Sequence, residues 1–170
     1  MQQKRLEPAE KTFNLILKLT PKDADAHFYL SNIYDELKKR DEAIKELRKV
    51  LELDPNYHRA LNYLGYIFIE ENRNLAEAET MIKKALELES DNGAYIDSLG
   101  WLYFKQGKVD KSIKELEKAS TLIEDPVIYD HLGDVYFKSK NLEKAKLNWE
   151  KALKLDPAQE AVKKKLETVK

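Results

Sequence analysis

The sequence predicts an all-α protein, a solenoid built of antiparallel helix pairs. Three observations predict this class: one pair of residues recurs at a nearly constant spacing, a second apolar series recurs in step with it, and helix-breaking residues are few. Only 5 glycines and 5 prolines occur in 170 residues, whereas 36% of the residues are charged and 42% are hydrophobic. Such a composition favours long helices over strands and turns.

The first series marks the first helix of each repeat. A leucine followed by a small residue recurs at steps of 34, 35 and 33 residues (64−30, 99−64, 132−99), at Leu30-Ser31, Leu64-Gly65, Leu99-Gly100 and Leu132-Gly133. Three residues after each small residue stands an aromatic one: Tyr34, Phe68, Tyr103 and Tyr136. Residues three and four apart share one face of a helix, so each block predicts an amphipathic helix.

The second series marks the second helix of each repeat. Small residues recur at Ala9, Ala43, Ala78, Ser112 and Ala145, and four residues later come the large residues Phe13, Leu47, Ile82, Leu116 and Trp149. Each block is too short to fold alone, so two helices are expected to pair in every repeat. A small residue on each helix lets the two axes approach to about 8 Å.

Turn residues separate these blocks. Proline ends the helices at Leu19-Thr20-Pro21, Leu53-Asp54-Pro55 and Leu155-Asp156-Pro157, because it cannot continue a helix. Inside the pairs, the turns carry Asn74, Gly107 and Asn141, which are residues that tolerate the left-handed backbone of tight turns.

These residues and spacings resemble the tetratricopeptide repeat (TPR) family, and the resemblance covers almost the whole chain. The resemblance implies a right-handed superhelical solenoid. In the family's 34-residue frame it also implies four full repeats at 24–57, 58–92, 93–125 and 126–159. Residues 160–170 are expected to form a capping helix. Residues 1–23 match only the second helix of a repeat, at Pro8 to Leu19. This predicts an open N-terminal face around Phe13 that is available for self-association, as in a C-terminal piece of a longer protein.

In TPR proteins the first helices line the concave face of the superhelix, where a peptide or helix of a partner protein binds. The resemblance therefore implies a protein partner and a groove formed by twelve residues: Phe28, Asn32, Asn62, Tyr66, Ile69, Asp97, Trp101, Phe104, Lys105, Asp134, Phe137 and Lys138. Five of them, Tyr66, Ile69, Trp101, Phe104 and Phe137, would form an exposed apolar strip suited to docking. The alternative is that neighbouring repeats bury these rings.

Two further interpretations remain open. The repeats could instead serve as a structural, homo-oligomerising module with an empty groove. The runs LNYLGY, YIDSLGW and DPVIYDHLGD also resemble the closing repeats of large bacterial TPR proteins, some of which are envelope lipoproteins that tether enzymes. The compartment stays open between cytoplasm and periplasm. The family's clamp for a terminal carboxylate is not expected, because its positions hold Phe28, Asn32, Tyr63, Ala94 and Ser98 without a cationic residue.

Composition and motifs argue against other functions. With 30 Lys plus Arg against 31 Asp plus Glu, the chain has no basic field for nucleic acid, and it has no cysteine. No segment approaches the about 20 apolar residues needed to cross a bilayer, so we expect no direct membrane insertion. Glycine-rich phosphate loops, zinc-binding histidine pairs and nucleophile elbows are missing from the sequence, so we expect no enzyme activity, cofactor or metal. Ser98, His131 and nearby acids have the residue types of a catalytic triad. Nothing supplies an oxyanion hole for them, so we expect no catalysis there.

Overall fold

The computed structural model describes residues 3–169, with side chains from residue 6 onward. This part of the chain contains ten helices and no strand. They are α1 (Gln3–Leu19), α2 (Ala24–Glu36), α3 (Arg40–Leu53), α4 (His58–Glu70), α5 (Leu75–Leu88), α6 (Gly93–Lys105), α7 (Val109–Leu122), α8 (Pro126–Lys138), α9 (Leu142–Leu155) and α10 (Glu160–Glu167). The predicted all-helical class is confirmed.

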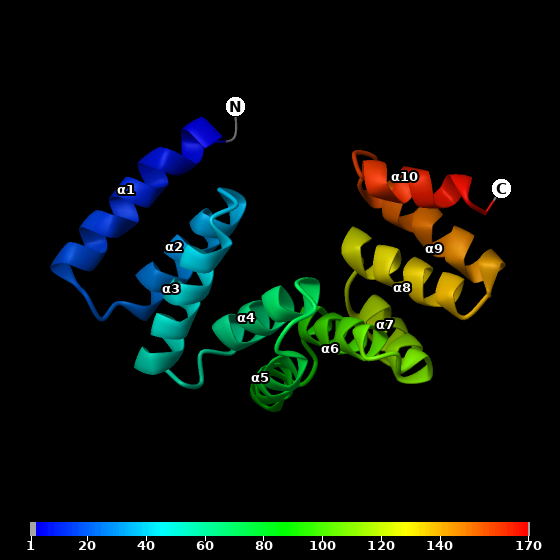
Figure 1. The fold of residues 1–170 in the computed structure, drawn as a ribbon, viewed down its shortest axis with the longest axis horizontal. Coiled ribbons are helices and arrows are strands. Elements are labelled where there is room, and N and C mark those ends of the chain that lie inside the picture. The colour runs from blue at the N-terminus through cyan, green and yellow to red at the C-terminus, as the bar shows by residue number, and fades with distance from the viewer. Residues whose placement is uncertain (1–2, 170) are drawn as a thin grey trace.

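The helices form a curved stack of hairpins (Figure 1). The closest packing joins α2 with α3, α4 with α5, α6 with α7, and α8 with α9. The first helices α2, α4, α6 and α8 follow the inner side of the arc, and contacts of α4 with α6 and of α6 with α8 link neighbouring hairpins directly. The two ends of the chain lie on the same side of the arc, which therefore encloses a concave inner face.

Each hairpin turn uses one left-handed residue at an equivalent place. These residues are Lys38, Asn72, Gly107 and Lys140, with φ of 62°, 49°, 75° and 65°. The next backbone N–H in each turn reaches back to the first helix, as Lys39 does to Tyr34 O over 2.8 Å, which satisfies a terminal carbonyl. Asn74 is also left-handed, whereas Asn141, with φ of −89°, is not. Lys140 makes the left-handed step, which leaves Asn141 free to cap α9 by accepting the backbone N–H of Lys144.

The joints between hairpins are capped by side chains. Asp23, Asn92 and Asp125 accept backbone N–H groups of the helix that follows each of them. At the N-terminus, α1 begins five residues before Pro8, where the sequence predicted its start. Pro8 lies close enough to the helix start that its missing N–H deprives only the carbonyl of Lys4 of a partner.

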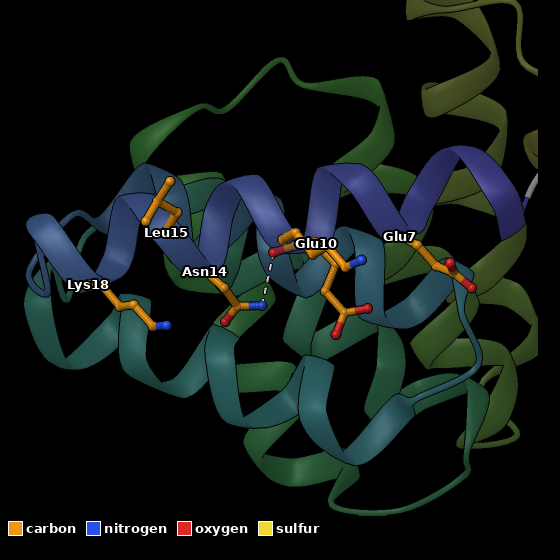
Figure 2. A pocket seen from close by; sticks show the side chains of 6 residues that line it. Glu7, Glu10, Asn14, Leu15 and Lys18 are labelled. Carbon is orange, nitrogen blue, oxygen red and sulfur yellow. Dashed lines mark hydrogen bonds between the residues drawn. The ribbon is translucent and has the colours of Figure 1, made fainter.

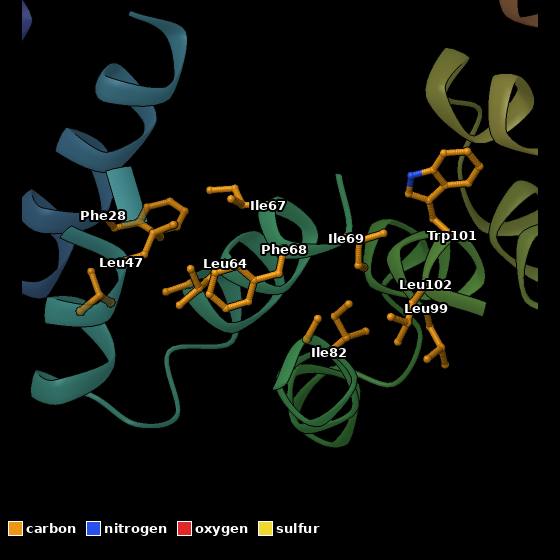
Figure 3. Packing of buried hydrophobic residues seen from close by; sticks show 13 residues of the cluster. Phe28, Leu47, Leu64, Ile67, Phe68, Ile69, Ile82, Leu99, Trp101 and Leu102 are labelled. Atoms are coloured by element: carbon orange, nitrogen blue, oxygen red, sulfur yellow. The ribbon is translucent and has the colours of Figure 1, made fainter. Parts of the chain in front are cut away.

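The core is one apolar band that passes from hairpin to hairpin. Figure 3 shows its central part, with Phe28 of α2 and Leu47 of α3, then Leu64 and Phe68 of α4, and Ile82 of α5. A second cluster continues through α7, α8 and α9 to Val162 of the capping helix α10. Because each hairpin buries its apolar side against its neighbours, stability is expected to be a sum of neighbour terms.

Candidate functional site

The twelve predicted groove residues lie on α2, α4, α6 and α8, but they differ widely in exposure. Four are buried, namely Phe28, Ile69, Asp97 and Trp101. Six are half-buried, namely Asn32, Asn62, Tyr66, Phe104, Lys105 and Asp134, and two are exposed, Phe137 and Lys138.

The exposed apolar strip is wrong for two of its five members. Ile69 is 0% exposed and Trp101 is 6% exposed, so the alternative, burial between neighbouring repeats, holds for both. The physical reason is visible at Trp101, whose indole stacks on the His131 ring of the next first helix with centroids 4.0 Å apart and an interplanar angle of 10°. Only Phe137, 44% exposed, presents a largely open ring.

Trp101 is the centre of a network that joins three first helices. Its other neighbour is Phe104, with ring centroids 4.8 Å apart. Its indole N–H donates to Glu70 Oε1 of α4 over 2.7 Å. Trp101 is therefore a structural contact between α4, α6 and α8, and replacing it would disturb the stack rather than a free surface.

His131 continues this network into a buried ion pair. Its Nδ1 lies 2.9 Å from Asp97 Oδ1, and both side chains are less than a tenth exposed. Burial lowers the pKa of His131, but the nearby carboxylates of Asp97, Asp130 and Glu70 outweigh burial and raise it above the ordinary 6.5. The pair therefore favours the protonated imidazole.

The Asp97–His131 pair also argues against a catalytic triad of Ser98, His131 and an acid. Ser98 Oγ donates to the Ala94 carbonyl of its own helix over 3.0 Å. Among the described residues no hydrogen bond joins Ser98 to His131. With His131 committed to Asp97 and stacked on Trp101, these residues hold two helices together.

Asp97 and His131 belong to a series of equivalent pairs that runs along the inner face. Each pair combines the fifth residue of one first helix with the sixth of the next. The pairs are Phe28 with Tyr63, Asn62 with Ser98, Asp97 with His131, and Asp130 with Lys165. We call them rungs. The sequence did not reveal them, because the rungs vary from an aromatic pair to ion pairs. Aligning the fifth and sixth positions of adjacent repeats would have found them.

The rung of Asn62 and Ser98 is the one that stays open. Asn62 Oδ1 is buried and has no hydrogen-bond partner, whereas Ser98 bonds within its own helix. A buried polar oxygen without a partner costs about 1–3 kcal/mol, so this position favours a donor from outside.

A hollow of about 260 Å³ lies beside this open rung, and we call it the joint-side hollow. Its lining includes Asn62, Tyr66, Ala94, Ser98, Val127 and Ile128. Ala94 and Val127 are exposed and form open walls. Burial and the nearby carboxylates Glu70 and Asp97 raise the pKa of Tyr66, so its hydroxyl stays protonated and can donate.

A second hollow, of about 490 Å³, lies at the ends of the same helices, and we call it the turn-side hollow. It is lined by Asn72, Phe104, Lys105, Gly107, Val109 and Lys138. The two hollows are connected through contacting side chains. Asp97, which also lines the joint-side hollow, bonds His131, and the His131 ring stacks on Trp101. Trp101 in turn stacks on Phe104 of the turn-side hollow.

The carboxylates of the inner face are mostly occupied by the protein itself. Asp25 and Asp35 accept the hydroxyls of Tyr57 and Tyr63 over 2.5 and 2.7 Å. At the far end, Lys165 of α10 pairs with both Asp130 and Asp134. The predicted groove residues Asp97 and Asp134 therefore act first as links between repeats.

At the N-terminal end, the second-type helix α1 packs against α2 but has no first helix of its own among the described residues. Ala43, Leu47 and Val50 of α3 are 0% exposed, whereas their equivalents on α1, including Phe13, are only half-buried. Figure 2 shows a hollow on α1 alone, lined by Glu7, Glu10, Asn14, Leu15 and Lys18, with Asn14 bonding the Glu10 carbonyl.

Leu15 is 59% exposed, and it stands where the other second helices carry Lys49, Lys84, Lys118 and Lys151. Self-association through this end stays a prediction.

Among residues 3–169, no cluster of three or more histidine or acidic side chains has the arrangement of a metal site. Likewise, no described helix combines the length and the apolar character that a bilayer span requires.

Comparison with known families identifies the repeat. Residues 24–57 and 126–159 match a family model described as tetratricopeptide repeat, and residues 95–126 match a second model with the same description. Together these matches cover more than half of the chain.

Curated relatives are similar over part of their length. A TPR repeat-containing protein of Pseudomonas aeruginosa is 31% identical over 118 residues, which are 69% of this chain and 20% of that protein. The BBSome complex member BBS4 of Bos taurus is 34% identical over 123 residues, 71% of this chain and 22% of that protein. The chain therefore spans about a fifth of the length of these curated relatives.

Solved structures show the same fold. A thermophilic TPR protein of Thermus thermophilus has a TM-score of 0.80 at 21% identity, with 97% of this chain and 90% of that chain covered. PilW, a widely conserved type IV pilus biogenesis factor, has a TM-score of 0.83 at 20% identity, with 99% and 80% covered. These likenesses concern the fold and confirm the predicted solenoid.

Proposed function

This chain belongs to the tetratricopeptide repeat family, and we propose that it is a non-catalytic scaffold that holds a segment of a partner protein against α4, α6 and α8. TPR repeats generally mediate protein–protein interaction, and TPR proteins are generally non-catalytic scaffolds. The finer proposal is the place of binding, the joint-side hollow.

The observation that carries this proposal is the open rung. Asn62 Oδ1 is a buried acceptor without a partner at a position where the next two rungs are closed by His131 and Lys165. A backbone N–H of an extended peptide is a suitable donor, because it would satisfy Asn62 as His131 and Lys165 satisfy Asp97 and Asp130. Tyr66 offers a hydroxyl beside it, and Val127 and Ile128 offer apolar contact.

The test is to select binders from a random peptide library displayed on phage and to map one selected peptide by amide chemical shifts. We expect the largest shifts at Asn62, Ala94 and Val127. Ala94→Trp would fill the hollow and should weaken binding at least about tenfold, which corresponds to about 1.4 kcal/mol. Ala76→Trp is the matched control, because Ala76 is also an exposed helical alanine but lies on the second helix α5.

Two outcomes would contradict the proposal. Shifts confined to α3, α5 and α7 would place the binding surface on the outer helices. Equal binding by the Ala94→Trp variant and the wild type would remove the hollow from recognition. Trp101 and Phe104 are unsuitable for this test, because Trp101 is buried and joins three helices.

A second candidate function is structural: repeats that associate end to end with an empty groove. The exposure of two leucines of α1, Leu15 and Leu19, at 59% and 78%, favours it. Multi-angle light scattering over a concentration series distinguishes the two. A concentration-dependent oligomer that Leu15→Glu dissociates, combined with no peptide selected from the library, supports the structural function; a monomer argues against it.

A further inference from the structure

We propose that the turn-side hollow recognises an acidic residue next to an apolar one in the partner segment. This inference rests on the proposed function and adds the chemistry of the ligand. It is carried by two lysines without anionic partners beside apolar side chains.

The first observation is the state of Lys105 and Lys138, which both line the turn-side hollow. Within residues 6–169, no ion pair includes either lysine. The Lys105 ammonium instead lies 4.7 Å from the centre of the Trp101 ring. Two cations that share one hollow favour an anion from outside.

The second observation is the contrast with the carboxylates of the inner face. Asp35 pairs with Arg40, Asp97 with His131, and Asp130 and Asp134 with Lys165. These acids are therefore neutralised within the protein, while the positive charge of the turn-side hollow is not. The two charged residues that line the turn-side hollow are both lysines, although the whole chain carries a net charge of −1.

The third observation is the apolar surface beside each lysine. Lys105 follows Phe104, which lines the hollow with Val109, and Lys138 follows Phe137, which is 44% exposed. The Phe137 ring packs against the ring of Trp149, with centroids 5.6 Å apart, and this contact helps to fix its position. A ligand that places a carboxylate on the lysines can bury an apolar side chain on Phe104 or Phe137 in the same step.

The corresponding residues of the two earlier first helices have the opposite character. The Phe-Lys pairs 104–105 and 137–138 align with Asp35-Glu36 on α2 and Ile69-Glu70 on α4. The groove thus changes from acidic at α2 and α4 to basic and aromatic at α6 and α8. An acidic, apolar segment is attracted to the C-terminal half and repelled from the N-terminal half, which fixes where along the groove it binds.

The test uses the same random peptide library, scored for composition and for dependence on the two lysines. We expect selected peptides to be enriched in Asp or Glu adjacent to Leu, Ile or Phe. Fluorescence polarisation with one such peptide should show about tenfold weaker binding by each of the variants Lys105→Glu and Lys138→Glu, and a further loss in the variant that carries both changes. The affinity of the wild type should fall as salt is added.

Controls separate charge recognition from loss of structure. Both lysines lie at the C-terminal ends of their helices, where a positive charge stabilises the helix by interacting with the negative end of its dipole. The neutral variants Lys105→Gln and Lys138→Gln are therefore measured as well, because they place no negative charge there. The double variant Lys118→Glu/Lys146→Glu is the matched control, because its net charge changes by as much as that of Lys105→Glu/Lys138→Glu. Its two sites are exposed positions on α7 and α9. Circular dichroism during urea unfolding identifies any variant that has lost its fold.

The outcomes distinguish this inference from the proposed function. Acid-enriched peptides that need Lys105 and Lys138, but not Lys118 and Lys146, support it. Peptides that bind the groove without acidic enrichment, or equally well to the Lys105→Gln and Lys138→Gln variants, overturn the inference and leave the proposed function standing. A library that yields no groove-binding peptide at all overturns both.

Discussion

Among the five glycines of the chain, Gly133 has the least room for a side chain, which predicts that a single methyl group added there destabilises the last hairpin. Gly133 lies on α8 and faces Trp149 of α9, the helix that packs against α8. A Cβ there would lie 2.2 Å from Nε1 and 2.3 Å from Cδ1 of Trp149, whose side chain is only 2% exposed. Because the indole is enclosed, it cannot simply turn away, and α8 and α9 must separate or the ring must move.

The expected cost of Gly133→Ala follows from three effects. Overpacking a dense core by one methyl group costs about 1–3 kcal/mol. Displacing Trp149 also weakens the 3.2 Å bond from its indole N–H to Asp134, which costs about 1 kcal/mol. Alanine gains about 0.5–1 kcal/mol over glycine inside a helix. The net expectation is a loss of about 1–3 kcal/mol in the free energy of unfolding.

The assay is urea unfolding followed by circular dichroism and by tryptophan emission, since Trp101 and Trp149 are the two tryptophans of the chain. Gly65→Ala is the matched control. Its Cβ would meet Ile82 Cγ1 at 2.9 Å, a milder overlap than the one at Gly133, so Gly65→Ala should cost less than Gly133→Ala. The reasoning is refuted if Gly133→Ala unfolds at the wild-type urea concentration, or if both variants lose equal stability.

Three further predictions concern the rungs and the turns. The folded-state pKa of His131 is raised above 6.5, so its contribution to stability should be complete below pH 6.5 and lost as the pH rises through the folded-state pKa. In urea unfolding, His131→Gln should therefore make the free energy of unfolding depend less on pH. Lys165→Met should cost about 1–2 kcal/mol, because two partly buried carboxylates lose their partner, whereas Lys163→Met should cost below about 0.5 kcal/mol; equal losses in thermal unfolding would contradict this. Lys140→Gly should stabilise the protein by up to about 1 kcal/mol, because glycine adopts the φ of 65° without strain, and a lower melting temperature would disprove it.

Most of the fold could be predicted from the sequence, because packing repeats the same residue types at the same places. The small residue at Ser31, Gly65, Gly100 and Gly133 is needed wherever two helices cross, and its spacing is therefore visible in one chain. The helix end at Lys140 was less visible. Its left-handed backbone is occupied by lysine rather than glycine, and the adjacent Asn141 is the commoner residue type for such a turn.

The candidate site was predictable only in outline. The family frame places the twelve groove residues on the inner helices, but it does not state how close the neighbouring first helix lies. Trp101 is buried because His131 of the next repeat stacks on it, and that contact depends on the curvature of the stack. The unpartnered oxygen of Asn62 is equally invisible in the sequence, since an asparagine that is satisfied and one that is not are written alike.

The distribution of repetition along the chain supports the proposed place of binding on the inner face. The outer helices repeat even their surface residue types, as the lysines at 49, 84, 118 and 151 show. The rungs of the inner face occupy equivalent positions but vary in chemistry, from an aromatic pair at Phe28, through the open rung at Asn62, to ion pairs at Asp97 and Asp130. Packing alone does not require this variety, because a rung of any one type would hold two helices. Varied rungs make hydrogen bonding and charge change along the groove, and a surface that changes along its length can bind one segment in one register.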